Sequence, residues 1–495
     1  MTPSKYQLAI YDAFQNTKYN INISAVAGSG KTTVLLELLK LIPKGKTALF
    51  LAFNNTIVEE LRNRIKLRDG VEIMTIHSYG WHSILRRYGS KVKMNPSKCI
   101  GKIEKVLKTY DDEISAKKRG WFFYIIPLII DLLRCNLLEA TKDNIAYIAD
   151  HHDLFIGDLE TKVAIDVFAL MNRDHRQFDF MDMIYQPHVD KSLRHQKYDY
   201  VFCDESQDFS PAQHDIIKSA ISRNGRLICV GDENQAIYGF AGADVESYEK
   251  LSNLNGESIA LPLSVCYRCS RAVVIEAQEI VPQISYAPNA EMGLVAQGSL
   301  TDIQRGDWVL CRNLRPLVQT YLWLMKNKIK SKIRGKEIGE GILALINKTG
   351  AKTIKGLMNL LDAEKNKLYK KLKERGVKHP SLHPKMELLN QRIDVIVCLV
   401  NEVDDVKGLK RLIESIFTDD VKGILLSTIH KAKGLENNKI FFLCPELIPS
   451  KYATQPWQFE QERNLRYIAI TRARNELIYV SGSQFKQDIQ SKIKL

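Results

Sequence analysis

The sequence has little that would place it in a membrane or outside the cell. Its most apolar run, Trp121 to Ile130, is too short to span a bilayer and contains Pro127. The first residues, Met1 to Gln7, lack the apolar stretch of a secretory signal. We therefore expect a soluble, cytoplasmic protein with no membrane partner, and we interpret the apolar run as a buried helix.

The cysteines also lack the regular spacing of a disulfide framework or a zinc site. There are nine, an odd number, and several lie within apolar runs, which indicates buried thiols in a reducing compartment. Cys266-Tyr-Arg-Cys269 is a lone C-x-x-C, with no second pair or histidine cluster nearby. Zinc or redox chemistry is therefore disfavoured there.

The length and the charge bound the class of protein. At 495 residues the chain is too long for one hydrophobic core, and about three domains are expected. Seventy-one Lys and Arg residues against 57 Asp and Glu give a net charge of +14. That excess favours a polyanionic partner, most simply a nucleic acid, although a well-solvated basic surface explains the charge equally well.

Short apolar runs with strand character alternate with helical patterns, which predicts parallel sheets covered by helices. The runs in the first half are Ile21–Val26, Thr47–Phe53, Val71–Ile76, Tyr200–Asp204 and Leu227–Asp232. Those in the second half are Ser258–Leu263, Asp307–Cys311, Lys422–Ser427, Ile440–Cys444 and Leu477–Ser481. A long helical stretch interrupts the strands in each half. The predicted fold is therefore α/β, with two parallel-sheet cores in tandem, each carrying a mainly helical insertion.

The domain boundaries follow from where these patterns change. We expect the first core at residues 1–80 and 196–257, with a helical insertion at 81–195. The second core is expected at 258–339 and 419–495, with an insertion at 340–418. The cationic helix Lys365–Arg375 lies in that insertion, and a solvated helix face is favoured over nucleic-acid contact there.

A glycine-rich loop follows the first strand run. It is closed by Gly30-Lys31-Thr32, and a helical pattern begins at Val34. Strand, loop and helix in this order are typical of a nucleoside-triphosphate cradle, in which backbone N–H groups face the phosphates. Ala25 stands where the first glycine is usual and is small enough to keep the turn. The residues expected to hold the nucleotide are Ala27, Gly28, Ser29, Gly30, Lys31, Thr32 and Thr33.

Two roles within the loop follow from chemistry. Lys31 is expected to reach the β- and γ-phosphates, and the Thr32 hydroxyl to bind Mg²⁺. Asp204 and Glu205 come directly after a later apolar strand run, where a carboxylate pair serves as metal ligand and general base. We assign the metal to Asp204 and the base to Glu205. An acidic turn without a ligand is the alternative.

The next strand run leads into a loop with polar and aromatic residues. Gln235 is placed to sense the γ-phosphate. Tyr238 and Phe240 lie two residues apart in a Gly-rich context, where aromatic rings can stack on unpaired bases. Taken alone, two loop aromatics would more often pack in a core.

The order of these motifs resembles the superfamily 1 helicases of the UvrD/Rep/PcrA type, and the resemblance covers nearly the whole chain. Further segments fit this family: Thr2–Gln7, Leu51–Asn55 with Glu60–Arg64, Thr75–Ser78, Leu261–Ser270, Val309–Asn313, Ser427–Glu436 and Gln461–Ala473. The resemblance implies two RecA-like domains. It also implies an ATP-dependent 3′→5′ DNA helicase and single-strand translocase that hydrolyses ATP at the cleft between the two cores.

The resemblance also implies residue roles. Gln7 would read the adenine, Tyr267 would stack on it, and Glu436 would contact the ribose or the phosphate end. Arg268 and Arg472 would reach the γ-phosphate from the second core, because a planar guanidinium offers fixed donors to the developing charge. The implied catalytic set is Lys31, Glu205, Gln235, Arg268 and Arg472. The implied nucleic-acid track is Phe53, Asn55, His77, Tyr238, Phe240, Arg312 and His430.

The sequence departs from the family pattern at a few positions, and none of them removes a catalytic group. Thr33 stands where relatives often carry an arginine against the adenine, so looser base selectivity is expected. Ala241, Cys266 and Asn464 replace residues of other motifs. The second insertion is also much shorter than in the large bacterial repair helicases.

The expected cofactors are ATP and Mg²⁺, and the expected partners are single-stranded DNA and tailed duplex DNA. We expect a monomer, with a loading or accessory protein as a candidate partner. Two alternatives remain open. One is a single-strand translocase that strips proteins or needs a partner to unwind a duplex, and the other is an ATP-gated nucleic-acid-binding switch.

Overall fold

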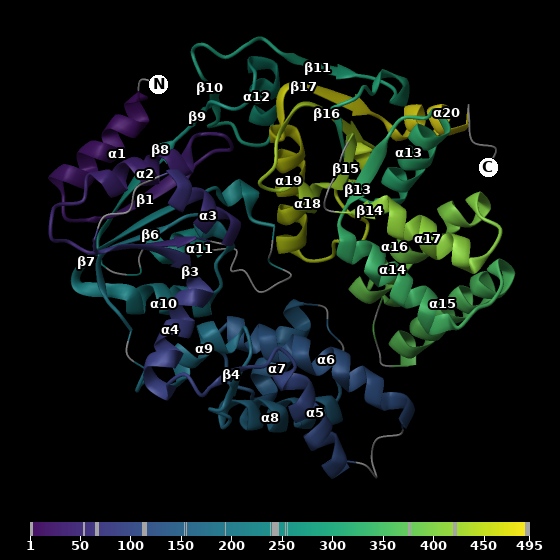
Figure 1. Cartoon of the computed structure of the whole chain (residues 1–495), viewed down its shortest axis with the longest axis horizontal. Coiled ribbons are helices and arrows are strands. Elements are labelled where there is room, and N and C mark those ends of the chain that lie inside the picture. Colours follow the sequence, from purple (N-terminus) through teal and green to yellow (C-terminus); the bar gives the residue numbers. More distant parts are fainter. Residues whose placement is uncertain are drawn as a thin grey trace. The chain divides into compact units, whose positions relative to one another are not determined.

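The computed structural model describes residues 3–52, 55–64, 69–110, 116–152, 154, 156–193, 195–237, 239, 247–252, 254, 256–374, 377, 379–418 and 423–490. The chain forms two compact units, Met1–Ser264 and Val265–Leu495. Each unit contains one large parallel sheet with helices against it (Figure 1). The predicted α/β class with two parallel sheets in tandem is confirmed, and every predicted run overlaps a strand.

The sheet of the first unit has six parallel strands in the order β3-β2-β6-β7-β1-β8. The strands are β1 (Asn20–Ala25), β2 (Ala48–Ala52), β3 (Val71–Thr75), β6 (Tyr198–Cys203), β7 (Ile221–Gly231) and β8 (Ser258–Leu263). Strand β2 is buried at every residue, as expected for a central parallel strand covered on both faces. The order places the carboxyl ends of β6, β7 and β1 side by side.

Helices cover both faces of this sheet. Side chains of α1 (Lys5–Asn16), α2 (Lys31–Lys40) and α3 (Asn55–Arg64) pack on one face in a single apolar cluster. Side chains of α4 (Ile76–Tyr88), α10 (Pro211–Ala220) and α11 (Ser247–Ser252) pack in a second cluster that includes Leu49 and Leu51 of β2. The sheet is therefore the middle layer of three.

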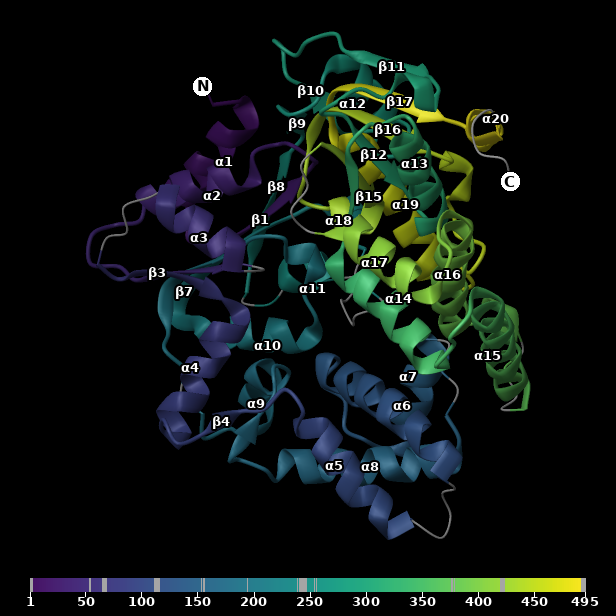
Figure 2. The same cartoon turned by 45° about the vertical axis from the view of Figure 1, so that its right-hand side comes forward.

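The helical segment of the first unit has an apolar core of its own. Its elements are β4 (Lys93–Met94), α5 (Lys98–Leu107), α6 (Ala116–Cys135), α7 (Lys142–His151), α8 (Asp158–Asn172), β5 (Gln177–Phe178) and α9 (Asp182–Val189). Helices α5 to α8 lie together as a group in both views (Figures 1 and 2). The apolar run Trp121–Ile130 lies within α6 and supplies much of this core, which confirms that it is a buried helix.

A buried ion network and a close helix contact hold this segment in place. Lys98 and Arg134 both bind the carboxylate of Asp182, at 2.7 and 2.8 Å. Helix α4 crosses α9 at Gly80, where a Cβ would lie 1.8 Å from the carbonyl oxygen of Met183. The boundary predicted after residue 80 therefore falls inside α4, which reaches from the sheet to the helical segment.

The second unit contains a seven-stranded parallel sheet in the order β11-β17-β16-β12-β15-β13-β14. Its strands are β11 (Leu294–Gln297), β12 (Trp308–Cys311), β13 (Ser331–Arg334), β14 (Phe417–Thr418), β15 (Ile424–Thr428), β16 (Asn437–Leu443) and β17 (Ala473–Val480). Strands β9 (Val265–Cys266) and β10 (Ser285–Tyr286) form a separate pair. The short strands β11, β13 and β14 were not predicted, because four or fewer residues leave too little alternation to recognise.

One predicted assignment is wrong. The run Ser258–Leu263 was expected to begin the second core, but it forms β8 and pairs with β1 along its whole length. The carbonyl of Leu263 accepts a hydrogen bond from the N–H of Val26 at 3.1 Å. An apolar run identifies a strand but not its neighbour in the sheet, so the boundary between the units lies after Ser264 and not at 257.

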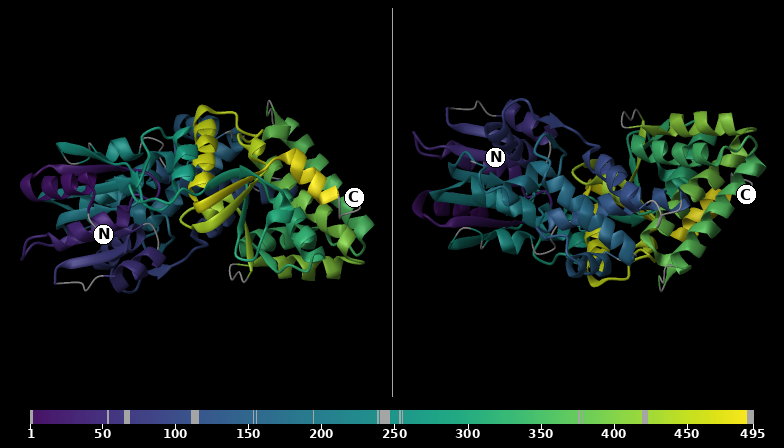
Figure 3. Two further views of the ribbon diagram at one scale, coloured as in Figure 1. Left: turned by 90° about the horizontal axis from the view of Figure 1, so that it is seen from above. Right: turned by 90° about the horizontal axis from the view of Figure 1, so that it is seen from below.

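The helices of residues 336–416 share their core with the second sheet. They are α14 (Lys336–Thr349), α15 (Ile354–Glu374), α16 (Pro384–Leu399) and α17 (Val406–Ile416). Most of their buried apolar side chains belong to one cluster that also includes strand residues and α13 (Leu314–Lys326). Helices α14 and α17 pack on the edge strand β14. The helices of this segment, green in Figure 3, lie grouped together in both views. Helices α12 (Arg271–Gln278), α18 (Ile429–Ala432), α19 (Pro456–Thr471) and α20 (Gly482–Gln490) complete the unit.

Candidate active site

The loop between β1 and α2 has the geometry of an anion cradle. Gly28 and Gly30 have φ values of +67° and +83°, which side chains other than glycine rarely adopt. The Ser29 hydroxyl is buried and donates to the Val26 carbonyl at 2.8 Å, which closes the loop on itself. Among the described residues no side chain caps α2, so the helix dipole and the first N–H groups face the loop.

Two carboxylates meet the residues that follow this loop. The Thr32 hydroxyl donates to Asp204 Oδ2 at 3.1 Å, and Lys31 Nζ lies 3.5 Å from Glu205 Oε1. Residues 172 positions apart are thus brought together because β1 and β6 end at the same edge of the sheet. The structure therefore brings together the lysine predicted to bind phosphate, the threonine and the carboxylate predicted to bind the metal, and the predicted general base.

The electrostatics of Asp204 suit a cation site. Burial, together with the neighbouring Glu205, raises the pKa of Asp204 to about 6, against the opposing charge of Lys31. A buried carboxylate of this kind is stabilised by an added positive charge. Among the described residues there is no group of three or more His, Cys, Asp or Glu side chains placed to hold a metal. One carboxylate and one hydroxyl suit Mg²⁺, which usually keeps waters and binds substrate phosphates as its other ligands.

Glu205 is held by a residue that sequence reasoning did not single out. Gln207 donates from Nε2 to Glu205 Oε2 at 2.6 Å, and its Oε1 accepts from the N–H of Asp232 at 3.0 Å. Glu205 itself has a φ of +54°. Gly231 makes room for this turn, since a Cβ there would lie 2.5 Å from Ser206 Oγ. In the sequence, the signal for this role was a polar residue two positions after the predicted base.

Gln235 lies at the same edge of the sheet. Its Nε2 donates to Asp232 Oδ2 at 2.5 Å, and both side chains are buried. Burial raises the pKa of Asp232, and the charges of Lys31 and Glu205 also act on it. The predicted γ-phosphate sensor is therefore close to the lysine and the base, with Asp232 as the residue that orients it.

Gln7 also lies against the loop. Its Oε1 accepts from the N–H of Ser4 at 2.9 Å, as part of a capping box that starts α1. Its Nε2 is 3.8 Å from the place a Cβ on Gly30 would occupy. Thr33 is exposed on the first turn of α2. Gln7 and Thr33, the two residues predicted to lie near the adenine, thus both border the loop.

The predicted residues of the second unit lie in three adjoining segments. Arg268 forms an ion pair with Glu436 Oε2 and donates from Nη1 to the Thr471 carbonyl at 3.4 Å. Arg472 is 1% exposed and donates from Nη1 to the Leu435 carbonyl at 2.9 Å. Tyr267, next to Arg268, is half-buried. The structure thus brings together Arg268, Arg472 and Glu436, and it adds Arg474, which was not predicted.

The comparison with known proteins decides the family. Residues 9–255 match the UvrD/REP helicase N-terminal domain, and residues 298–484 match the UvrD-like helicase C-terminal domain. The chain belongs to the UvrD/Rep helicase family. It is a UvrD/PcrA-like superfamily 1 enzyme, an ATP-dependent DNA helicase with two RecA-like domains.

Individual relatives differ in how much of their length the helicase chain covers. A probable DNA helicase of Mycoplasma pneumoniae is 24% identical over 481 residues, which is 92% of this chain and 79% of that protein. The ATP-dependent DNA helicase PcrA of Staphylococcus aureus is 24% identical over 289 residues, which is 54% of this chain and 39% of PcrA. A solved arterivirus nonstructural protein 10 helicase overlaps with a TM-score of 0.36 at 12% identity, covering 98% of this chain and 65% of that one. Such a score is too low to define a common fold.

The predicted nucleic-acid track of this UvrD/Rep-like helicase is described in part. Phe53, Tyr238 and Phe240 lie outside the described residues. Asn55 is exposed at the start of α3, and His77 is half-buried in the first turn of α4. Burial, with a smaller effect of Arg312, lowers the pKa of His430 to about 3, so this histidine is neutral at physiological pH.

Arg312 has a strong partner within the second unit. Its Nη2 donates to Glu462 Oε1 at 2.7 Å and its Nε donates to Glu462 Oε2 at 3.1 Å, and the side chains are 12% and 7% exposed. A bidentate pair of this kind leaves the guanidinium few donors for a phosphate. The structure therefore gives Arg312 a role in fixing α19 to the strand end at Cys311, and contact with DNA remains a prediction.

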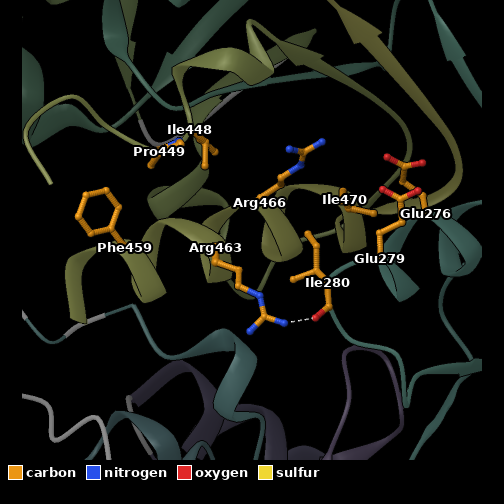
Figure 4. Close-up of a pocket in the computed structure, with 9 residues that line it drawn as sticks. All are labelled: Glu276, Glu279, Ile280, Ile448, Pro449, Phe459, Arg463, Arg466 and Ile470. Carbon is orange, nitrogen blue, oxygen red and sulfur yellow. Dashed lines mark hydrogen bonds between the residues drawn. The ribbon is translucent and has the colours of Figure 1, made fainter. Parts of the chain in front are cut away.

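The second unit also contains a pocket of about 330 Å³. It is lined by Glu276 of α12 and by Glu279 and Ile280 just after it, by Ile448 and Pro449, and by residues of α19 (Figure 4). Arg463 donates to the carbonyl of Ile280, while Arg466 leaves α19 in the opposite direction in this view. The lining, taken over the described residues, contains none of the predicted nucleotide or DNA residues.

No helix within the described ranges is long and apolar enough to cross a membrane.

Proposed function

We propose that this helicase couples ATP hydrolysis to 3′→5′ movement along single-stranded DNA and to separation of a duplex with a 3′ tail. The observation that carries the proposal is the pairing of Thr32 with Asp204 and of Lys31 with Glu205 on one edge of the first sheet. These four side chains match the parts that phosphoryl transfer requires, namely a phosphate cation, two metal ligands and a base.

Each residue of the set has a distinct task. Lys31 holds the β- and γ-phosphates, and Thr32 with Asp204 holds Mg²⁺, which neutralises phosphate charge when bound. Glu205 orients the attacking water and accepts its proton. Gln235 reports the presence of the γ-phosphate.

The remaining roles rest on the family resemblance together with local geometry. Gln7 reads the base beside the loop, and Tyr267 stacks on the adenine. Arg268 and Arg472 act on the γ-phosphate, and Glu436 contacts the ribose or phosphate end. The track residues hold the strand by stacking and by backbone contacts, which are tolerant of sequence.

The first test removes the phosphate lysine and the base separately. Lys31→Ala and Glu205→Gln should each reduce DNA-stimulated ATP hydrolysis at least about a hundredfold, because positioning and charge stabilisation supply most of the catalysis. Lys40→Ala is the matched control, since Lys40 lies on the same helix and its exposed ammonium group pairs with Glu37 at 2.6 Å. Unchanged turnover in the Lys31 variant would contradict the proposed site.

The second test uses duplexes with a single tail. Unwinding of a 3′-tailed duplex, but not of a 5′-tailed one, is the expected result. Unwinding from 5′ tails alone would contradict the proposed polarity. The Lys31→Ala variant, which should release no strand from either duplex, is the control.

A translocase that does not unwind by itself is the second candidate. The observation that favours it is the second helical segment, most of whose described buried apolar side chains share one core with the sheet. ATP hydrolysis on single strands without release of the complementary strand would support this candidate. Slow hydrolysis that DNA does not stimulate would instead support a nucleotide-gated switch.

A further inference from the structure

The carboxylate of Glu436 is shared between two arginines. Arg474 donates to Oε1 from Nε at 3.0 Å and from Nη2 at 2.5 Å. Arg268 pairs through its Nε with the other oxygen, Oε2. Both guanidinium groups therefore bind one side chain, and each takes a different oxygen.

The main chain fixes these residues relative to one another. The Ser270 N–H donates to the Arg474 carbonyl at 2.7 Å, and the Ser270 hydroxyl donates to the Asn475 carbonyl at 3.0 Å. The Asn437 N–H donates to the Arg472 carbonyl at 3.0 Å. The segments that carry Arg268, Glu436 and Arg474 are thus joined by backbone hydrogen bonds. These bonds fix the positions from which the two arginines reach the carboxylate of Glu436.

We propose that Arg474 is a positioning residue for γ-phosphate recognition, because it occupies one oxygen of Glu436 and so limits the hold of Glu436 on Arg268. This inference rests on the proposed function, in which Arg268 acts on the γ-phosphate. It assigns a task to a residue that follows Arg472 by two positions and that no motif singled out.

A carboxylate can bind one guanidinium through both of its oxygens, or two guanidinium groups through one oxygen each. A guanidinium that takes both oxygens forms a bidentate pair, which is stronger and more rigid than a contact with one oxygen. While Arg474 holds Oε1, Arg268 has only Oε2. Arg268 can then exchange Glu436 for a phosphate oxygen at lower cost.

Arg474 also protects Glu436 after that exchange. Burial disfavours the ionised carboxyl, but the charges of Arg268 and Arg474 outweigh it and hold the pKa of Glu436 below its usual range. When Arg268 leaves, Arg474 remains as the counter-charge, so no half-buried anion is left without a partner. Without Arg474, release of Arg268 would remove both guanidinium groups from the oxygens of Glu436, although the charge of Arg472 also acts on this carboxylate.

The test compares nucleotides with and without a γ-phosphate. In Arg474→Gln, the affinity for a non-hydrolysable ATP analogue and the DNA-stimulated kcat should each fall about fivefold, the effect of one partly exposed charge pair. The affinity for ADP should change less than about twofold. Arg474→Lys keeps the charge and should restore part of the loss. The Arg474 side chain is 56% exposed, so both variants should fold.

Two controls separate positioning from a general structural role. Glu476 lies on the same strand as Arg474, and Glu476→Gln removes its ion pair with Lys439, at 3.3 Å. This variant should leave the affinity for the ATP analogue, the affinity for ADP and the DNA-stimulated kcat unchanged. In a Glu436→Gln background, Arg474→Gln should have no further effect, because the shared carboxylate is absent. Equal losses for ADP and the analogue, or a full effect in that background, would overturn the inference.

A failure of the Arg474 proposal can be told apart from a failure of the proposed function. If wild-type protein shows no DNA-stimulated hydrolysis, the proposed function fails. The two nucleotide affinities, measured by equilibrium titration, still decide whether Arg474 affects γ-phosphate binding.

Discussion

Replacing Gln207 should affect both stability and catalysis, because its two ends serve different partners. The side chain is 2% exposed. Its Oε1 accepts from the N–H of Asp232 at 3.0 Å, and its Nε2 donates to Glu205 Oε2 at 2.6 Å. Gln207→Ala removes both of these bonds, together with a longer one from Nε2 to Asp208 Oδ2 at 3.4 Å, without changing the nucleotide loop.

The magnitudes follow from the two bonds. A buried N–H left without an acceptor costs about 1–3 kcal/mol, so the free energy of unfolding should fall by about 2 kcal/mol. A hydrogen bond to a charged group contributes about 1.5–3 kcal/mol, but the Glu205 side chain is 26% exposed, so water recovers part of it. A loss of about 1–1.5 kcal/mol in orienting the base corresponds to a kcat reduced about five- to tenfold.

The assay is DNA-stimulated ATP hydrolysis at saturating ATP, with urea unfolding on the same preparations. Gln196→Ala is the matched control, because the exposed Gln196 also donates an amide N–H to a carboxylate, Glu72, at 2.8 Å. It should leave hydrolysis unchanged. A Gln207→Ala enzyme that loses stability but turns over within twofold of wild type would refute the argument that Gln207 orients Glu205.

A second variant tests the same reasoning through pH. Gln207→Glu keeps an acceptor for Asp232 but places a carboxylate against Glu205. A like charge raises the pKa of Glu205, and the base acts only when ionised. Activity should therefore be lost as the pH falls and partly regained at pH 8–9, relative to wild type at each pH. An unchanged pH profile would contradict this account.

Three further predictions concern stability, each measured by urea unfolding. Burial, with smaller effects of nearby charges, lowers the pKa of His195 to about 4, so stability present at neutral pH should be lost as the pH falls from 6.5 towards 4. The loss should be about 1–2 kcal/mol at pH 5, and His195→Gln should remove it; an equal loss in that variant would contradict the assignment. Gly80→Ala should cost about 3 kcal/mol or more, because the Cβ would lie 1.8 Å from the carbonyl oxygen of Met183; a neutral effect would mean that the helices separate freely. Glu462→Ala should cost about 3 kcal/mol, because it leaves the largely buried Arg312 guanidinium with only the more distant carboxylate of Glu387, at 3.8 Å, among the described residues, and a cost below about 1 kcal/mol would contradict that role.

The nucleotide side of the site could be predicted from the sequence because its signals are local. Gly30, Lys31 and Thr32 are consecutive, and Asp204 and Glu205 directly follow an apolar strand. Their meeting followed from one rule, that parallel strands place their carboxyl ends at a common edge. The structure brings these residues together as that rule requires.

Other features depend on partners distant in the sequence and could not be predicted. Strand β8 was placed in the wrong unit because its pattern fits either sheet and only pairing with β1 decides. Arg312 and Glu462 are 150 residues apart, and each lies in a segment that resembles a different motif. Gln207 stands two positions after Glu205 in the sequence, but its second bond, to Asp232, depends on the neighbouring strand β7.

The helical segments of the two units should behave differently as the protein unfolds. Helices α5 to α8 close around a core of their own, whereas α14 to α17 share one core with the second sheet. In hydrogen exchange, amides of α16 and of strand β15 should therefore become accessible in a single cooperative step, while amides of α6 can open before those of β1. A variant that lacks residues 340–418 would then lose the second sheet as well, so the second unit cannot fold without this segment.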